Sequence, residues 1–84
     1  MIGRLVLPDR IVYEGEVTGV VVRTLDGDAT FLAGHTPFIA ALVPGSTVRF
    51  DGGDEAMSAV LGNGGFVEVD GEVVTVSAPV AETT

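Results

Sequence analysis

His35 is the only histidine in the sequence, so a serine-based hydrolytic site would have to be built around it. Such a site needs a serine nucleophile within hydrogen-bond reach of the histidine and a carboxylate that orients the ring. The chain offers Ser46, Ser58 and Ser77, but no Gly-x-Ser-x-Gly turn surrounds any of them. A histidine in a Gly-His-Thr-Pro turn is typical of a turn or contact residue. The sequence therefore predicts no catalytic set. A small hydrolase built on His35 stays a third interpretation, which His35→Ala tests.

Two further motifs resemble ligand sites without meeting their requirements. Residues 62–65 are glycine-rich, but the chain has no lysine and no Gly-Lys-Ser/Thr ending to hold phosphates. Several acids offer oxygen ligands, yet their spacing lacks the regular acids and the closing glutamate of an EF-hand loop. We predict turns and solvated loops here, with no cofactor and no metal site. The acids in question are Asp26, Asp28, Asp51, Asp54 and Glu55.

The charge of the chain limits its partners. Twelve acidic residues stand against four arginines, and the formal net charge is -8. A surface of this sign repels phosphate backbones and anionic lipid, so no nucleic acid is expected as a partner. No segment approaches the roughly 20 apolar residues of a membrane span, so direct membrane insertion is not expected either. The absence of cysteine excludes disulfides and thiolate metal sites.

The apolar content predicts a surface that binds a partner. The chain has 84 residues, enough for one small domain, and such a domain buries only about 60–65% of the surface of its unfolded chain. Hydrophobic residues make up 46% of the sequence, and the 12 glycines bring the apolar share to about 60%, above the roughly 45–50% of ordinary domains. Apolar surface is therefore left over, and a contiguous patch of it usually marks a binding site.

Residue types and turn signals predict an all-β chain. Valine outnumbers leucine fifteen to six, and β-branched side chains favour strands over helices. Glycine, proline and aspartate recur between runs that are mostly four to eight residues long, the usual strand length. Asp70-Gly71 predicts a type I′ turn that joins residues 66–69 to 72–78 as a hairpin. Residues 51–54 predict a longer loop between residues 47–50 and 55–61.

Alternation along the strands indicates which faces are buried. Val48 and Phe50 fall on one face of their strand and Arg49 on the other, as in a half-buried strand. Residues 20–22 and 38–43 are apolar throughout and do not alternate. Such strands imply either close packing of two sheets or an outer face that a partner covers, and composition leaves both open.

Several ordered segments together resemble one family, the epsilon subunit of F-type ATP synthase. The resemblance is to its amino-terminal β-sandwich and runs in order over nearly the whole chain. The most specific set is the Gly-His-x-Pro turn followed by an apolar strand and Pro-Gly, with an acidic-Gly-acidic loop upstream. The matching segments are residues 7–17 (LPDRIVYEGEV), 26–28 (DGD), 34–42 (GHTPFIAAL), 44–45 (PG), 64–69 (GGFVEV) and 73–76 (VVTV).

The resemblance implies a small antiparallel β-sandwich of about ten short strands over residues 1–79, followed by a short tail, residues 80–84. It implies a non-catalytic rotor subunit at the foot of the central stalk. Such a subunit binds gamma and the polar loops of the c-ring and couples ion-driven rotation to ATP synthesis. Its expected place is peripheral, on the cytoplasmic face of the inner (plasma) membrane, as part of the complex. Many members continue into a helical hairpin that inhibits hydrolysis or binds ATP, and this chain is expected to do neither.

Site residues are carried over by position. Charged loop contacts are expected to contribute little, because an exposed ion pair is worth about 0–1 kcal/mol. Apolar contacts should therefore dominate, and Phe38→Asp or Ile39→Asp should weaken gamma binding more than Asp28→Ala. The expected c-ring contacts are Asp26, Asp28 and His35, and the expected gamma contacts are Phe38, Ile39, Ala40, Leu42 and Asn63. The alternative function is a free-standing β-sandwich module that binds a protein or a small ligand.

Overall fold

A computed structural model describes residues 1–53 and 56–84. This part of the chain forms ten strands and no helix, which confirms the predicted all-β sandwich of about ten short strands. No described segment is therefore a helix long and apolar enough to cross a membrane. The strands are β1 (Ile2–Leu7), β2 (Arg10–Glu16), β3 (Gly19–Thr24), β4 (Gly27–Leu32), β5 (Phe38–Leu42), β6 (Ser46–Asp51), β7 (Met57–Leu61), β8 (Gly65–Val69), β9 (Val73–Ser77) and β10 (Glu82–Thr83).

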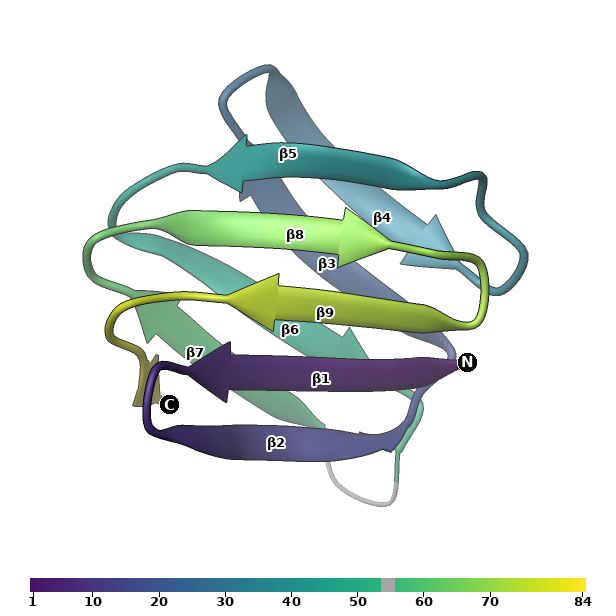
Figure 1. Ribbon diagram of the computed structural model, residues 1–84, viewed down its shortest axis with the longest axis horizontal. Helices are drawn as coiled ribbons and strands as arrows, with labels where there is room; N and C mark the ends of the chain where they lie inside the picture. Colours follow the sequence, from purple (N-terminus) through teal and green to yellow (C-terminus); the bar gives the residue numbers. More distant parts are fainter. Residues whose placement is uncertain (54–55) are drawn as a thin grey trace.

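The strands form one continuous sheet that folds over into two layers (Figure 1). The layer that we call the front sheet has the order β5-β8-β9-β1-β2, and the back sheet has the order β4-β3-β6-β7-β10. The ladder between the two layers is a single pair, Thr24 on β3 and Leu42 on β5. Among the ladders of the described residues, β1–β9 is parallel and the others are antiparallel.

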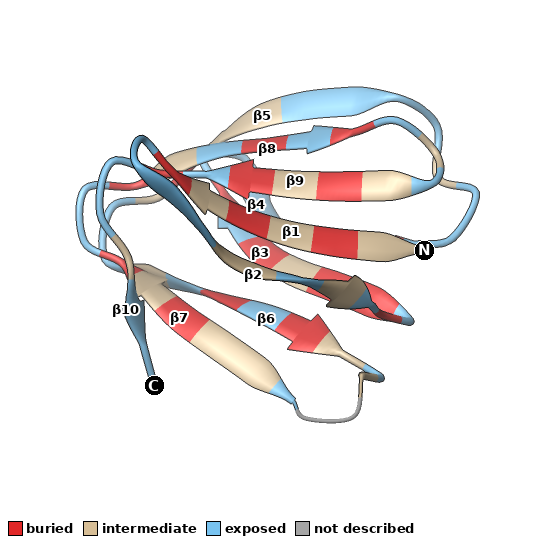
Figure 2. Ribbon diagram, turned by 60° about the horizontal axis from the view of Figure 1, so that its bottom comes forward, coloured by how far each residue is buried: buried red, intermediate tan, exposed pale blue. Residues whose placement is uncertain are grey.

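The core lies between the two sheets and is built by alternation. Along β6, Val48 and Phe50 are fully buried and Arg49 is exposed, as predicted. The same alternation runs through β1, β8 and β9, where Leu5 and Val67 face the interior (Figure 2). Because side chains point to opposite faces with a period of two, these strands present one apolar face to the opposite sheet and the other to solvent.

The two apolar runs that do not alternate in the sequence each place some side chains in the core and some outside it. In β3, Val20 and Val22 are buried and Val21 is half-buried. In β5, Ile39 is 67% exposed and Ala41 is half-buried on the outer face. The outer face of the front sheet thus carries apolar side chains that no other part of the described chain covers, as expected of the surplus apolar content.

The hairpin at Asp70-Gly71 is confirmed, but the predicted type I′ turn is wrong. It requires positive φ at both central residues, whereas Gly71 has a φ of +84° and Asp70 does not have a positive φ. The turn is longer instead: the Asp70 backbone N–H donates to the Val73 carbonyl at 3.1 Å, and the Val73 N–H donates to Asp70 Oδ1 at 3.2 Å. The loop predicted at residues 51–54 lies between β6 and β7, and Asp54 and Glu55 lie outside the described residues.

The segment predicted as a tail, residues 80–84, includes strand β10. Glu82 pairs with Val60 and Thr83 with Ala59, both on β7. The Thr84 backbone N–H also donates to the carbonyl of Ser58 at 3.0 Å. The end of the chain therefore forms the edge of the back sheet.

A matched pair of leucine truncations tests this account of the core. Leu5→Ala should lower the free energy of unfolding by about 2–5 kcal/mol, because it opens a cavity at a fully buried position. Leu32→Ala, at a position that is 59% exposed, should change it by less than about 0.5 kcal/mol. Urea denaturation followed by circular dichroism measures both, and equal losses would contradict the assignment of the buried face.

Candidate functional site

The outer face of the front sheet carries a row that crosses all five strands and is apolar except for Ser77 on β9; we call it the apolar row. The strand register places Ala41 beside Phe66, Phe66 beside Ser77, Ser77 beside Val6 and Val6 beside Ile11. Phe66 is 56% exposed and Ile11 is 55% exposed. The adjacent row is more polar and runs Ile39, Glu68, Thr75, Arg4, Glu14.

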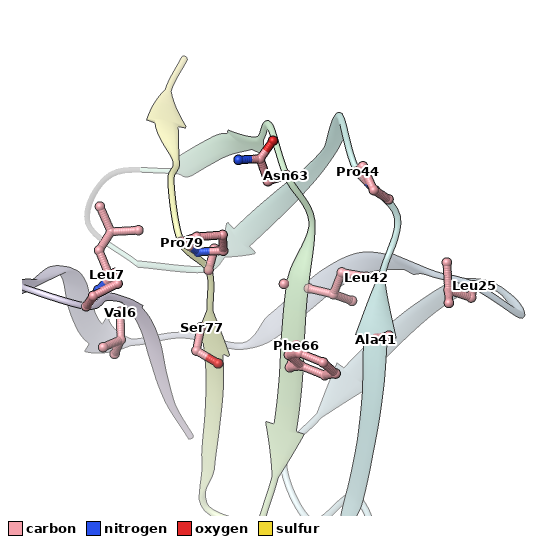
Figure 3. A pocket seen from close by; sticks show the side chains of 13 residues that line it. Val6, Leu7, Leu25, Ala41, Leu42, Pro44, Asn63, Phe66, Ser77 and Pro79 are labelled. Atoms are coloured by element: carbon pink, nitrogen blue, oxygen red, sulfur yellow. The ribbon is translucent and has the colours of Figure 1, made fainter.

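A groove of about 760 Å³ continues the apolar row toward one end of the sandwich (Figure 3). Figure 3 shows Phe66 and Ala41 on neighbouring strands, with Leu25 beside them and Asn63 at the loop end. No charged side chain lines this groove, so it favours an apolar occupant. It is lined by Val6, Leu7, Pro8, Leu25, Ala41, Leu42, Pro44, Asn63, Gly65, Phe66, Ser77, Ala78 and Pro79.

The β3–β4 turn contains two of the expected c-ring residues, Asp26 and Asp28, which differ in their ion pairing. Asp28 accepts two hydrogen bonds from Arg23 across the hairpin, from Nε at 2.7 Å and from Nη2 at 3.5 Å. These hydrogen bonds, together with the positive charge of Arg23, lower the pKa of the Asp28 carboxyl. Asp26 lies at the exposed tip and, within the described residues, has no ion-pair partner.

A buried hydroxyl group stabilises the base of this turn through two hydrogen bonds. Thr24 is 6% exposed, and its Oγ1 donates to the Gly27 carbonyl at 2.8 Å and accepts from the Asp26 backbone N–H at 3.1 Å. The Leu25 backbone N–H donates to the carbonyl of Ala41 on β5 at 3.2 Å. The turn is therefore fixed both internally and to the front sheet.

His35 lies in the loop between β4 and β5, at the opposite end of β4 from Asp26 and Asp28. Its ring stands edge-on to Phe31, with ring centroids 4.9 Å apart and an interplanar angle of 86°. Its Nδ1 is 2.7 Å from the carbonyl of Thr36. The structure thus places His35 in an aromatic cluster and does not bring it to the β3–β4 turn.

The described residues do not assemble a hydrolytic triad around His35. Ser46 Oγ donates to the Val43 carbonyl at 2.6 Å, and Ser58 Oγ is hydrogen-bonded to Thr84 Oγ1 at 2.7 Å. Ser77 belongs to the apolar row on the front sheet. The geometry gives the hydrolase interpretation no support.

The expected gamma contacts divide between the outer face and the core. Ile39 and Asn63 are exposed, and Leu42 is 3% exposed at the floor of the groove. Phe38 and Ala40 sit opposite Val69 and Val67, buried residues of β8, and so face inward. Phe38 is 42% exposed at the sheet end, with its ring centroid 5.6 Å from that of Phe31.

Sequence reasoning missed the exposed residues that complete the surface: Leu25, Phe66 and Ile11. Phe66 precedes the buried Val67, so alternation within the predicted strand 66–69 places it outward. Leu25, by contrast, reaches the groove only because β3 pairs with β5 at Thr24, and no local signal in the sequence indicates that pairing.

All four arginines are paired with carboxylates, so the surplus acids determine the surface charge. A partner of complementary charge is basic. The pairs are Arg4 with Glu14 (2.6 Å), Arg10 with Asp9 (3.6 Å), Arg23 with Asp28 (2.7 Å) and Arg49 with Asp51 (2.8 Å).

Fold and surface together define a small β-sandwich domain with an exposed apolar outer face. Residues 3–84 match the family described as "ATP synthase, Delta/Epsilon chain, beta-sandwich domain". The chain belongs to this family, which confirms the resemblance found in the sequence.

Curated relatives carry the name ATP synthase epsilon chain. That of Frankia casuarinae is 40% identical over 80 residues, which cover 95% of this chain and 93% of the relative. That of Alkalihalophilus pseudofirmus is 44% identical over 78 residues, which cover 93% of this chain and 57% of the relative. The chain therefore spans nearly the full length of one relative and little more than half of the other. These relatives confirm the prediction of a non-catalytic member of the family.

Solved structures of ATP synthases contain the same fold. A chain of the Euglena gracilis mitochondrial ATP synthase, solved as OSCP/F1/c-ring, superposes with a TM-score of 0.85 at 28% identity, covering 99% of this chain and 52% of that one. A chain of the Tetrahymena thermophila central stalk and c-ring structure gives a TM-score of 0.77 at 11% identity, covering 95% and 63%, which shows the fold alone.

The Arg23–Asp28 pair predicts a measurable pH effect. The folded-state pKa of Asp28 is lowered, so the pair stabilises the fold above the ordinary aspartate pKa and loses this contribution as the pH falls through the lowered folded-state pKa. Asp28→Asn should therefore reduce the loss of folding stability as the pH falls from the ordinary aspartate pKa through the lowered pKa of Asp28. The reduction should be small, because the side chains of Arg23 and Asp28 are both exposed. Carboxyl NMR titration should give an Asp28 pKa below the ordinary aspartate value, and a pKa at or above that value would contradict the pairing.

Proposed function

We propose that the chain is a non-catalytic central-stalk rotor subunit of an F-type ATP synthase, which binds gamma and the c-ring and couples ion-driven rotation to ATP synthesis. The single observation that carries the proposal is the apolar outer face of the front sheet, where Ile39 is 67% exposed and Phe66 is 56% exposed. A small domain of net charge -8 that exposes such an apolar face to solvent is expected to bind a partner there. Family membership and the ATP synthase assemblies that contain the same fold support this reading.

The front sheet is the proposed gamma surface. Ile39 and Asn63, both expected gamma contacts, lie on it or at its groove, and Leu42 forms the floor of the groove. Apolar burial supplies most of the affinity of such an interface, with the exposed polar row at its rim. Ala40 acts through the packing of β5, because it faces inward, whereas Phe38 is 42% exposed at the sheet end and can also touch a partner there.

The β3–β4 turn is the proposed c-ring surface. Asp26 and Asp28 lie at this turn, and the acidic chain suits a basic polar loop. His35 lies at the other end of β4, so we assign it to the support of β5 through Phe38. Contact with the c-ring would hold the subunit peripherally at the membrane surface, on the cytoplasmic face of the inner (plasma) membrane.

The two proposed surfaces are joined by backbone. Thr24 at the base of the turn pairs with Leu42 of β5, and the Val43 N–H donates to the Arg23 carbonyl at 3.0 Å beside this pair. A force applied at the turn thus reaches the gamma surface through hydrogen-bonded strands and not through a flexible linker. Stiffness between the two contacts is what a coupling element needs.

Substitutions on the two outer faces test the gamma surface. Ile39→Asp should weaken binding to the cognate gamma subunit about tenfold or more, because it replaces a large exposed apolar side chain of the proposed gamma surface with a charge. Leu32→Asp, a matched change on the back sheet at a position that is 59% exposed, should leave the affinity unchanged, and Asp28→Ala should cost less than Ile39→Asp. Titration calorimetry measures all three, and failure of the unsubstituted chain to bind gamma would overturn the proposed function.

Salt dependence gives a second test. Raising the salt from 0.1 to 1 M shortens the Debye length from about 10 Å to about 3 Å, which screens exposed ion pairs and spares apolar contacts. The chain should therefore stay bound to immobilised gamma at 1 M salt. Elution at that concentration would show that charge pairing, not apolar burial, holds the complex.

A further inference from the structure

Strand β10 covers the edge of the back sheet at β7 (Figure 2). The two strands pair antiparallel, and just beyond β10 the Thr84 backbone N–H donates to the Ser58 carbonyl at 3.0 Å. An uncovered sheet edge presents unpaired N–H and C=O groups, to which another extended segment can add. The edge of β7 is therefore a strand-addition site, and the chain's own residues 82–84 occupy it.

One pair of side chains fixes the register of this contact. Ser58 Oγ and Thr84 Oγ1 share a hydrogen bond at 2.7 Å. Side chains of a strand alternate between the two faces, so a slip by one residue would carry Thr84 to the other face and break this bond. Glu82 and Thr83 are exposed, so they restrict the choice of segment less. The site thus selects a segment with a hydroxyl side chain opposite Ser58.

The C-terminal segment, residues 80–84, has few apolar contacts. Ala81 packs against the core, whereas Val80 is 48% exposed. The segment and the end of β7 also border a cavity of about 350 Å³, so they are not closely packed along their whole length. A segment held by exposed backbone hydrogen bonds and little apolar burial is the kind that opens locally while the rest of a domain stays folded. The cavity is lined by Val60, Gly62, Val80, Ala81 and Glu82.

A hinge lies at the start of this segment. Ala78 is 6% exposed and its N–H donates to the Val6 carbonyl at 3.1 Å, which anchors the chain to the front sheet just after β9. Pro79 and Val80 follow and are both exposed, and a proline has no N–H with which to hold the chain to a neighbour. Rotation at these two residues would therefore release residues 81–84 and leave β9 in place.

We propose that the C-terminal segment exchanges between two copies of this chain, so that residues 82–84 of each copy pair with β7 of the other. The described contacts identify a second copy as the occupant, because the exchanged segment is identical and remakes each of them. Exchange in both directions closes a two-fold dimer, as expected when an identical element is swapped. This dimer uses the edge of the back sheet and is independent of the proposed function.

The charge of the chain opposes this association at long range but not at the contact itself. Each copy has a net charge of -8, so two copies repel each other. Within the contact, Glu82 lies beside Val60 on β7, and Val60 lies beside Thr47 on β6, so no second acid faces it there. Salt between about 0.1 and 1 M screens the long-range repulsion and should therefore favour the dimer.

Two single-cysteine variants of the full 84-residue chain test this exchange, because the sequence itself contains no cysteine. Ser58→Cys and Thr84→Cys place thiols at the two positions whose hydroxyls are hydrogen-bonded. Residues that face each other in an antiparallel pair lie within the Cα separation of a disulfide. The two variants are unfolded together in urea, refolded as a mixture and then oxidised, so that slow opening of the segment cannot prevent exchange.

The expected product is a disulfide between the two variants, identified by intact mass spectrometry. Its yield should be several times that of a control mixture in which Leu32→Cys, at an exposed position elsewhere on the back sheet, replaces Ser58→Cys. The yield should also rise with salt. A yield no higher than that of the control at low and at high salt would overturn the proposal.

The double variant Ser58→Cys/Thr84→Cys shows whether exchange is the route to the dimer. Oxidised as a monomer, it holds the segment on its own β7 and should stay monomeric in sedimentation velocity, while its reduced form, refolded at the same concentration, should contain a dimer. A dimer that the oxidised monomer forms equally well would show association through another surface and would also overturn the proposal. Urea denaturation checks that each variant is folded.

Discussion

Burial of one apolar face of each sheet against the other is the interaction on which the rest of this structure depends. An 84-residue chain can build only a small hydrophobic core. Four fully buried side chains lie in it between the layers: Leu5, Val48, Phe50 and Val67. Because strand side chains alternate, fixing these residues inside also fixes which neighbours face outward. The apolar outer face of the front sheet is thus a consequence of the core.

The outward residues of the front sheet are unusually apolar. Phe66 and Ile11 stand where a solvated sheet would carry polar side chains, and the groove beside them has no charged lining. The acids of the described residues lie at the turns, the sheet edges and the adjacent row, and every arginine is already paired. Apolar burial provides affinity for a partner, while the anionic surroundings favour a basic one.

The pairing of Thr24 with Leu42 joins the two layers of this domain. It is the ladder through which the two layers of the described chain form one sheet, and it lies between the turn and the outer face that we assign to different partners. Because hydrogen-bonded strands lie on both sides of this pair, few backbone torsions between the turn and the outer face are free to rotate. In the proposed rotor role, which involves no bond-breaking, the domain would act through such stiffness.

Much of the fold could be predicted from the sequence. The valine-rich runs, the turn residues and the alternation at Val48 and Phe50 were enough to predict the sandwich and one hairpin, because these signals act between near neighbours. The turn type at Asp70-Gly71 was wrong, because tertiary contacts, including the Gly34 N–H bond to the Gly71 carbonyl, act on this turn.

The candidate site was only partly predictable. The sequence by itself determined that apolar surface would be left over and that the chain would be acidic. Only the tertiary structure decided that Leu25 joins the groove, that Phe38 and Ala40 face inward, and that His35 lies away from Asp26 and Asp28. Those facts depend on strand pairing between residues far apart in the chain, which composition and local periodicity do not encode.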